Sequence, residues 1–273
     1  MQGQRDNVND LPEVDLTAHH RVRKTDVNKY NSVEQLKVTR QFFKIKCPAR
    51  ILVCGPSQIG KSHFIVNMME HRDVIFSDPI EYVNVFLPPN GMGAYTTFKN
   101  KLAAAMPEIP IRFREGLPHD EDIINKHGAH QVYIFDDVMA QFFNSERMAQ
   151  LMVQDSHHKN ITVIATSQNF FGKNQSARQT ILRNMTVQVL FWDRADLMSV
   201  SKMSTRLFRK PSFLLDAFEW LRKNPDIANN SRYIMVETTA NTDMALTMQA
   251  RSNIFPMKQP SGRVDVSPVF FMI

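Results

Sequence analysis

The feature that most constrains the fold is an eight-residue pattern that follows the first apolar segment. Residues 55–62 read GPSQIGKS, which fits GxxxxGK[ST], and they lie between the apolar run ILVC (51–54) and the helix-like run HFIVNMMEH (63–71). In this setting the glycines permit a tight turn and a close approach, and the N–H groups of the loop and the next helix form a cradle for phosphate. The pattern therefore predicts a strand, a phosphate-binding loop and a helix in succession.

The loop also predicts roles for its own side chains. We expect Lys61 to contact the terminal phosphates of ATP and Ser62 to ligate Mg²⁺. The alternative is a glycine turn with an incidental lysine, and the strand and helix on either side favour the phosphate loop. The residues expected to line the nucleotide site are Gly55, Pro56, Ser57, Gln58, Ile59, Gly60, Lys61, Ser62 and His63.

A second apolar strand ends in two carboxylates. Residues 131–137 read QVYIFDD, and together with a phosphate loop this is typical of a Walker B strand. We expect Asp136 to hold the water shell of Mg²⁺, and Asp137, one residue further on, to polarise the attacking water. The alternative is a strand followed by an acidic helix N-cap, which the phosphate loop upstream makes the weaker interpretation.

A third apolar strand, ITVIATSQ (161–168), ends in a polar amide. One branch of the P-loop folds inserts such a strand between the P-loop strand and the Walker B strand, with its terminal polar side chain near the γ-phosphate. Gln168 is therefore expected to act as a catalytic sensor that orients water or reports phosphate release. A glutamine that simply occupies a turn is the alternative.

Short apolar runs rich in β-branched and aromatic residues alternate with longer amphipathic stretches from residue 42 onward. This alternation predicts an α/β fold, and strands that are apolar on both faces indicate a parallel sheet covered by helices. We expect a P-loop NTPase of the additional-strand, RecA-like type, with a mostly parallel central sheet and helices on both faces. The remaining expected strands are YVNVFL (82–87), IRF (111–113), VQVLFW (187–192) and YIMVE (233–237).

Composition and patterning define the expected organisation of the chain. Hydrophobic residues make up 43% and charged residues 22%, which excludes a fibrous or a wholly disordered protein. We expect a polar, basic arm over residues 1–41, an ATPase domain over 42–257 and a tail over 258–273. No apolar run approaches the roughly 18 residues of a membrane span, and the start lacks the apolar core of a signal peptide. An intracellular, soluble protein that does not contact membranes is therefore expected.

The charge distribution indicates an acidic partner. The chain has a net charge of +6 and an isoelectric point near 9.3. Between residues 178 and 210, seven basic residues stand against two acidic ones, which leaves a net charge of +5. We expect this basic strip to contact the phosphates of double-stranded DNA, to supply an arginine to catalysis, or both.

Taken in order, these pieces resemble the genome-packaging ATPases of large and mid-sized eukaryotic DNA viruses, such as poxviruses, and of virus-like Polinton or adintovirus elements. These enzymes belong to the FtsK and HerA-like class of DNA motors. The resemblance covers about residues 43–256 and rests on GPSQIGKS, YIFDD, SHHKNITVIATSQNFF and TILRNMTVQVLFWDRAD. One departure is Asp137, which stands where many motors of the wider class carry glutamate.

The resemblance implies a ring-shaped homo-oligomer that uses ATP and Mg²⁺ to move double-stranded DNA into a preformed capsid. It implies capsid proteins as partners and a place in the host nucleus, at a cytoplasmic virus assembly site or in the virion. It also implies an arginine that reaches the nucleotide of the neighbouring subunit. Arg183 is the first candidate and Arg178 the second, and the alternative for both is a surface position on a helix.

Three other functions remain open at the level of sequence. A nucleotide kinase would share the phosphate loop, but the chain lacks an arginine-rich lid between helices. A helicase or replication-associated NTPase would share the whole motif set. A nucleotide- and DNA-binding scaffold would bind ATP without hydrolysing it.

Overall fold

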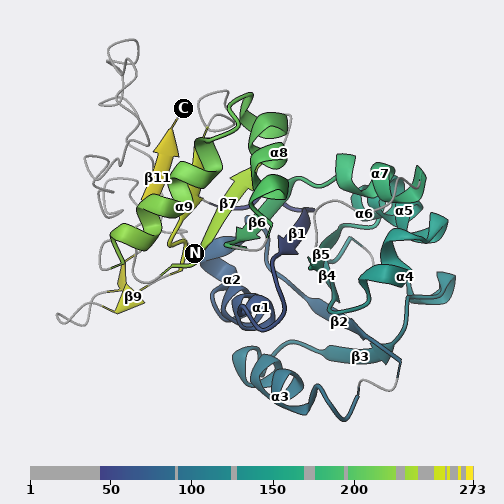
Figure 1. The fold of residues 1–273 in the computed structure, drawn as a ribbon. Helices are drawn as coiled ribbons and strands as arrows, with labels where there is room; N and C mark the ends of the chain where they lie inside the picture. Colours follow the sequence, from purple (N-terminus) through teal and green to yellow (C-terminus); the bar gives the residue numbers. More distant parts are fainter. Residues whose placement is uncertain are drawn as a thin grey trace, which may run out of the picture.

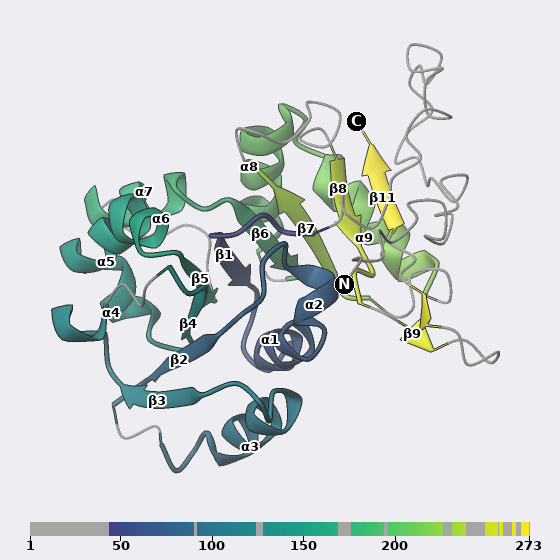
Figure 2. The same ribbon diagram turned by 180° about the vertical axis from the view of Figure 1, so that it is seen from behind.

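A nine-stranded sheet with helices on both faces forms the centre of the molecule (Figures 1 and 2). The computed structural model of the protein describes residues 44–89, 92–123, 128–168, 176–193, 196–225, 231–238, 249–255, 257–258, 264–265 and 269–272. The expected N-terminal arm, residues 1–41, lies outside the described residues. The strands of the sheet are β1 (Arg50–Cys54), β2 (Tyr82–Leu87), β3 (Ile111–Glu115), β4 (Gln131–Phe135), β5 (Ile161–Ser167), β6 (Val187–Phe191), β7 (Tyr233–Glu237), β8 (Gln249–Ser252) and β11 (Val269–Met272), whereas β9 (Met257–Lys258) and β10 (Val264–Asp265) pair separately.

The strand order is β11-β8-β7-β6-β1-β5-β4-β2-β3, and the six strands from β6 to β3 run parallel to one another. Strand β5 pairs with β1 on one side and with β4 on the other. This is the inserted strand of the additional-strand type, so the predicted fold class is confirmed. The central strands are buried along their whole length because helices cover both faces.

The other part of the sheet is antiparallel and extends further along the chain than the sequence indicated. Strand β7 pairs antiparallel with β6, and β8 and β11 continue the sheet beyond it. Strand β11 falls within residues 258–273, which were expected to form a tail. The ring of Phe271 in β11 is buried and lies 5.7 Å from that of Trp220, a distance between ring centroids.

The helices divide between the two faces of the sheet. The helices are α1 (Lys61–Glu70), α2 (Arg72–Ile75), α3 (Thr96–Ala105), α4 (Met139–Phe143), α5 (Glu146–Gln150), α6 (Ser156–His158), α7 (Ser176–Arg183), α8 (Leu197–Phe208) and α9 (Phe213–Lys223), with a 3-10 turn η6 (Asp120–Asp122) and a π-helical turn η7 (Leu151–Asp155). The first three helices pack against one face, and apolar residues of α4, α5, α7, α8 and α9 cover the opposite face (Figure 1). Within the described residues, no helix combines the length and the apolarity that crossing a bilayer requires.

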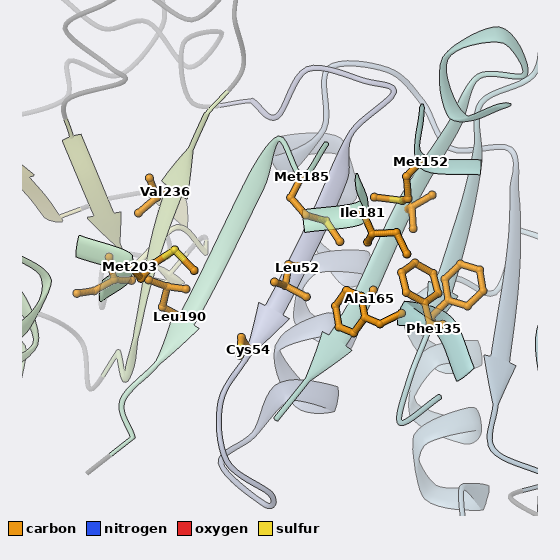
Figure 3. Packing of buried hydrophobic residues seen from close by; sticks show 14 of the residues in the cluster. Leu52, Cys54, Phe135, Met152, Ala165, Ile181, Met185, Leu190, Met203 and Val236 are labelled. Carbon is orange, nitrogen blue, oxygen red and sulfur yellow. The ribbon is translucent and has the colours of Figure 1, made fainter. Parts of the chain in front are cut away.

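The core under α7 and α8 shows how the helices hold the parallel strands in place (Figure 3). Leu52, Ala165 and Leu190 come from three adjacent strands and are at most 1% exposed. Ile181 of α7 and Met203 of α8 belong to the same buried cluster. Each fully buried side chain of this size stabilises the fold by about 1.5–3 kcal/mol. The strand ends that carry the candidate site are therefore rigidly held.

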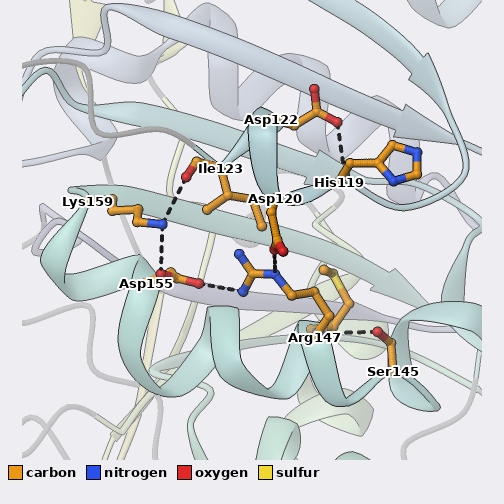
Figure 4. Close-up of polar contacts among 9 residues, drawn as sticks. His119, Asp120, Asp122, Ile123, Ser145, Arg147, Asp155 and Lys159 are labelled. Atoms are coloured by element: carbon orange, nitrogen blue, oxygen red, sulfur yellow. Dashed lines mark hydrogen bonds and ion pairs between the residues drawn. The ribbon is translucent and has the colours of Figure 1, made fainter.

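A charged cluster fastens the helical segment formed by α5, η7 and α6 to the loop before β4 (Figure 4). Arg147 donates to Asp155 from Nη1 and to Asp120 from Nε, both at 2.5 Å. Lys159 Nζ lies 2.9 Å from the second oxygen of Asp155 and donates to the carbonyl of Ile123 at 2.9 Å. Burial raises the pKa of Asp155, but the hydrogen bonds and the positive charges of Arg147 and Lys159 together lower it by more, so its pKa lies below the ordinary value.

We predict that Asp155→Asn lowers the free energy of unfolding by about 2 kcal/mol at pH 7, because the two cations lose a buried carboxylate. The pKa of Asp155 is lower in the folded than in the unfolded chain, so this stabilisation is present above about pH 4 and is lost as the pH falls through the folded value. Urea denaturation at several pH values measures it. Asp120→Asn is the control, because the side chain of Asp120 is 88% exposed and should contribute less than about 1 kcal/mol. Equal effects of the two substitutions would contradict the prediction.

Candidate active site

The loop between β1 and α1 needs its two glycines for different reasons. A Cβ at Gly55 would lie 2.6 Å from Cβ of Phe191 in β6, so a side chain there has no room. Gly60 has space around it, but its φ of +109° is in the left-handed region that side chains disfavour. The loop is thus pressed against the sheet at its start and turned into the N-terminus of α1 at its end, where backbone N–H groups are available to an anion.

Lys61 is the first residue of α1, and its side chain folds back over the loop. Its Nζ donates to the carbonyls of Gly55 and Pro56, both at 2.8 Å, and the residue is 8% exposed. Burial lowers the pKa of Lys61, and the charges of Asp137 and Asp136 act in the opposite direction. A buried cation beside a loop of backbone N–H groups is suited to binding a multiply charged anion.

Ser62 and Asp136 meet across the site. Ser62 Oγ donates to Asp136 Oδ2 at 2.8 Å, and Asp136 is 2% exposed at the end of β4. Burial raises the pKa of Asp136, the hydrogen bonds from Ser62 and Thr166 lower it, and the charge of Asp137 raises it further; the net direction is upward. A cation beside this carboxylate would favour its charged form.

These two oxygens fit the predicted Mg²⁺ site. A hydroxyl and a carboxylate oxygen are donors of the kind that Mg²⁺ takes, directly or through its bound water, and here they lie side by side. The described residues contain no group of three or more His, Cys, Asp and Glu side chains that could hold a metal. Ser62 and Asp136 would therefore hold Mg²⁺ together with phosphate and water oxygens, as Mg²⁺ prefers.

Asp137 differs from Asp136 in both backbone and exposure. It is exposed, and its φ of +55° lies in the left-handed region. Its N–H donates to Thr166 Oγ1 of β5 at 3.1 Å, and its Oδ2 accepts from the hydroxyl of Tyr95 at 2.6 Å. The left-handed turn directs the two consecutive carboxylates to different partners, one to Ser62 and the other to Tyr95.

Strand β5 brings the predicted sensor to the same edge of the sheet. The N–H of Gly55 donates to the carbonyl of Ser167 at 3.0 Å, which joins the start of the phosphate loop to the end of β5. Gln168 follows directly and is exposed. The topology thus brings Gln168 to the edge that also carries Lys61 and Asp136.

The two candidate arginines lie at different ends of α7. Arg178, in the first turn, is half-buried, and its guanidinium carbon lies 4.4 Å from the ring centroid of Phe143 in the same subunit. Burial lowers its pKa. Arg183, in the last turn, is exposed. Because α7 runs from the end of β5 back to the start of β6, Arg183 lies at the edge of the sheet opposite the phosphate loop.

Sequence reasoning missed two residues that contact the candidate base. Thr166 belongs to the predicted strand ITVIATSQ, but the contact it makes depends on the pairing of β5 with β4. Tyr95 lies in the segment before α3, 42 positions from Asp137. No motif marks it, and only the folded chain reveals the contact.

No protein-family model and no curated protein matches the sequence. Among solved structures, one similar to this chain is the genome packaging NTPase B204 from Sulfolobus turreted icosahedral virus 2, in complex with ATPγS. The match has a TM-score of 0.38 and 14% sequence identity, and it covers 56% of this chain and 80% of that chain. Similarity at this level carries no argument about function, so any functional conclusion depends on the residues of the site.

We predict different effects for the two carboxylates of β4. Asp136→Asn should weaken the binding of Mg²⁺–nucleotide and also abolish turnover, because it replaces the buried negative charge beside Ser62 with a neutral amide. Asp137→Asn should leave nucleotide binding within about twofold and lower turnover by at least about 100-fold, as expected for loss of a general base. Binding of a fluorescent ATP analogue with and without Mg²⁺, together with phosphate release, measures both. Equal and mild effects would support a plain acidic cap.

Proposed function

We propose that this chain is an ATPase that translocates double-stranded DNA and packages a viral genome into a capsid. The observation that carries the nucleotide part of the proposal is the meeting of Lys61, the Ser62–Asp136 pair and Asp137 at one edge of a parallel sheet. The packaging part is supported by the resemblance described for the sequence and by a basic surface on α8.

In the proposed reaction each side chain has a defined task. The loop N–H groups and Lys61 bind the β and γ phosphates and stabilise the charge that develops on them. Bound Mg²⁺ would neutralise phosphate charge, and Ser62 and Asp136 would hold it. Asp137 accepts a proton from water as the water oxygen bonds to the γ-phosphorus and the bond to the β–γ bridging oxygen breaks, which leaves ADP. Gln168, at the end of β5, orients the water or senses the release of phosphate.

Part of the basic strip lies on α8 and at the C-terminal end of this helix. Lys202 and Arg206 are one turn apart on the exposed side of the helix, and Arg209 and Lys210 continue the exposed charges at its C-terminal end. Residues spaced by four lie on one face of a helix. A row of cations of this kind matches the phosphates of a duplex and needs no base-specific contact. Arg194, which belongs to the predicted strip, lies outside the described residues.

The decisive experiment measures ATP turnover with and without double-stranded DNA. We predict that DNA stimulates turnover, and that a variant carrying Arg206→Gln and Lys210→Gln loses most of this stimulation. The slope of log affinity against log salt should decrease in magnitude by about 0.9 for each phosphate contact removed. Arg222→Gln is a matched control, because Arg222 is an exposed arginine on α9 outside the strip.

Lys61→Ala defines the baseline of this experiment and should show no turnover. DNA binding without turnover in the unmodified protein would favour the scaffold, and phosphate transfer to a small acceptor would favour a kinase. Unwinding of a forked duplex would favour a helicase. A triplex-displacement assay on blunt duplex reports translocation directly.

Arg183 is proposed to act on the nucleotide of a neighbouring subunit. Its position at the far edge of the sheet keeps it away from its own phosphate loop, and its exposure leaves it accessible to a second copy of the chain. The end of α7 is firmly held, because the carbonyl of the next residue, Asn184, accepts from Nε of Arg50 at 2.6 Å. Arg178 is the second candidate, although its stacking on Phe143 ties it to its own subunit.

We predict that Arg183→Ala lowers turnover by about 10³-fold or more, as loss of an arginine finger does, and leaves nucleotide affinity unchanged. Mixing this variant with Lys61→Ala should restore part of the activity, because some interfaces then contain an intact loop and an intact arginine. Arg178→Ala is tested in parallel. Full activity of Arg183→Ala alone would remove it as the finger, and turnover independent of protein concentration in a monomer would exclude a shared site.

A further inference from the structure

Tyr95 contacts the carboxylate to which water activation is assigned. Its hydroxyl donates to Asp137 Oδ2 at 2.6 Å, and the tyrosine is half-buried at the start of α3. Burial raises the pKa of the Tyr95 phenol above its ordinary value, and the hydrogen bond to Asp137 and the charges of Asp137 and Asp136 raise it further. The phenol therefore keeps its proton and remains a donor at neutral pH.

The segment that carries Tyr95 is fixed from several directions. Helix α3 packs on α1, the helix of the phosphate loop, and is anchored by the buried side chains of Phe98 and Leu102. The Tyr95 ring meets the ring of Phe98 edge-on, with centroids 6.4 Å apart. The hydroxyl and the N–H of Thr96 both donate to the carbonyl of Gly93, at 2.7 and 3.3 Å. The hydroxyl of Tyr95 is thus held in place relative to the phosphate loop.

Asp137 is therefore held at two points. The N–H bond to Thr166 Oγ1 fixes its backbone in the left-handed turn, and the bond from Tyr95 fixes one carboxylate oxygen. The side chain of an exposed aspartate can rotate about its two torsions, and such rotations displace its free oxygen from an attacking water. Misplacement of a reacting group by about 1 Å can lower a rate by about 100-fold.

We propose that Tyr95 is a positioning residue for Asp137: its hydroxyl occupies Oδ2 and leaves Oδ1 oriented to accept the proton of the attacking water. This inference rests on the proposed function, because it requires Asp137 to act as the base. The competing explanation is that the bond merely fastens the segment before α3 to the sheet.

The test is the Tyr95→Phe variant of the full chain, assayed with ATP, Mg²⁺ and double-stranded DNA. Phenylalanine at position 95 keeps the ring contact with Phe98 and lacks only the hydroxyl, so we expect an unchanged thermal unfolding midpoint. The proposal predicts that kcat falls by about 10-fold to 100-fold and that KM for ATP changes by less than about twofold. Tyr82→Phe is the control, because it also removes a tyrosine hydroxyl. Tyr82 is the first residue of β2, at the end of the strand away from the site, so both constants should stay unchanged.

A double-mutant cycle separates positioning from tethering. Because Tyr95 acts through Asp137, adding Tyr95→Phe to Asp137→Asn should not lower the single-turnover rate further. An unchanged kcat in Tyr95→Phe, a rise in KM alone, or an equal loss in both backgrounds would overturn the proposal. Turnover by Lys61→Ala would instead refute the proposed function, so the two failures are distinguishable.

Discussion

The parallel pairing of β1, β5 and β4 is the constraint on which the candidate site depends. Parallel strands end at the same edge of a sheet, and three successive ends here carry the phosphate loop, the Ser167–Gln168 step and the two aspartates. The N–H of Gly55 bonds to the carbonyl of Ser167, and the N–H of Asp137 bonds to the hydroxyl of Thr166. Strand β5 is thus bonded to both of the other strand ends, and the register of this strand fixes the relative positions of the phosphate loop and the acidic pair.

Burying the charged groups of the site costs free energy, and hydrogen bonds within the site offset this cost. Asp136 and Lys61 are both more than nine-tenths buried, and isolated ions in such surroundings would be strongly destabilising. The hydroxyl of Ser62 donates to the carboxylate of Asp136, and two loop carbonyls accept hydrogen bonds from the ammonium group of Lys61. Each of these partners belongs to the loop or to the first turn of α1. One short stretch of backbone, the loop and the first turn of α1, therefore supplies the partners of both charges, and a phosphate group and its counterion can exchange with these contacts.

The sequence predicted the parts of the molecule that depend on local pattern. The loop at residues 55–62 and the strands at 131–135 and 161–167 were predictable because apolar runs, glycines and terminal polar residues are adjacent along the chain. Strand β11 was not, because it is four residues long and lies at the edge of the sheet, where only its pairing with β8 identifies it. Tyr95 was not predictable either, because only the packing of α3 brings its hydroxyl to Asp137. A side chain that contacts a site from a distant segment belongs to no motif and no periodic pattern, so the sequence does not mark it.

The close approach of Gly55 to Phe191 presses the phosphate loop directly against the end of β6. Phe191 ends β6, and the chain continues from this strand to the helix that bears the exposed cations. No side chain of the loop lies between the Cα of Gly55 and this strand end, since a Cβ there would be 2.6 Å from Phe191. Close-packed interiors transmit displacement with little compliance. A displacement of this strand end therefore reaches the phosphate loop directly, with no flexible side chain of the loop between them.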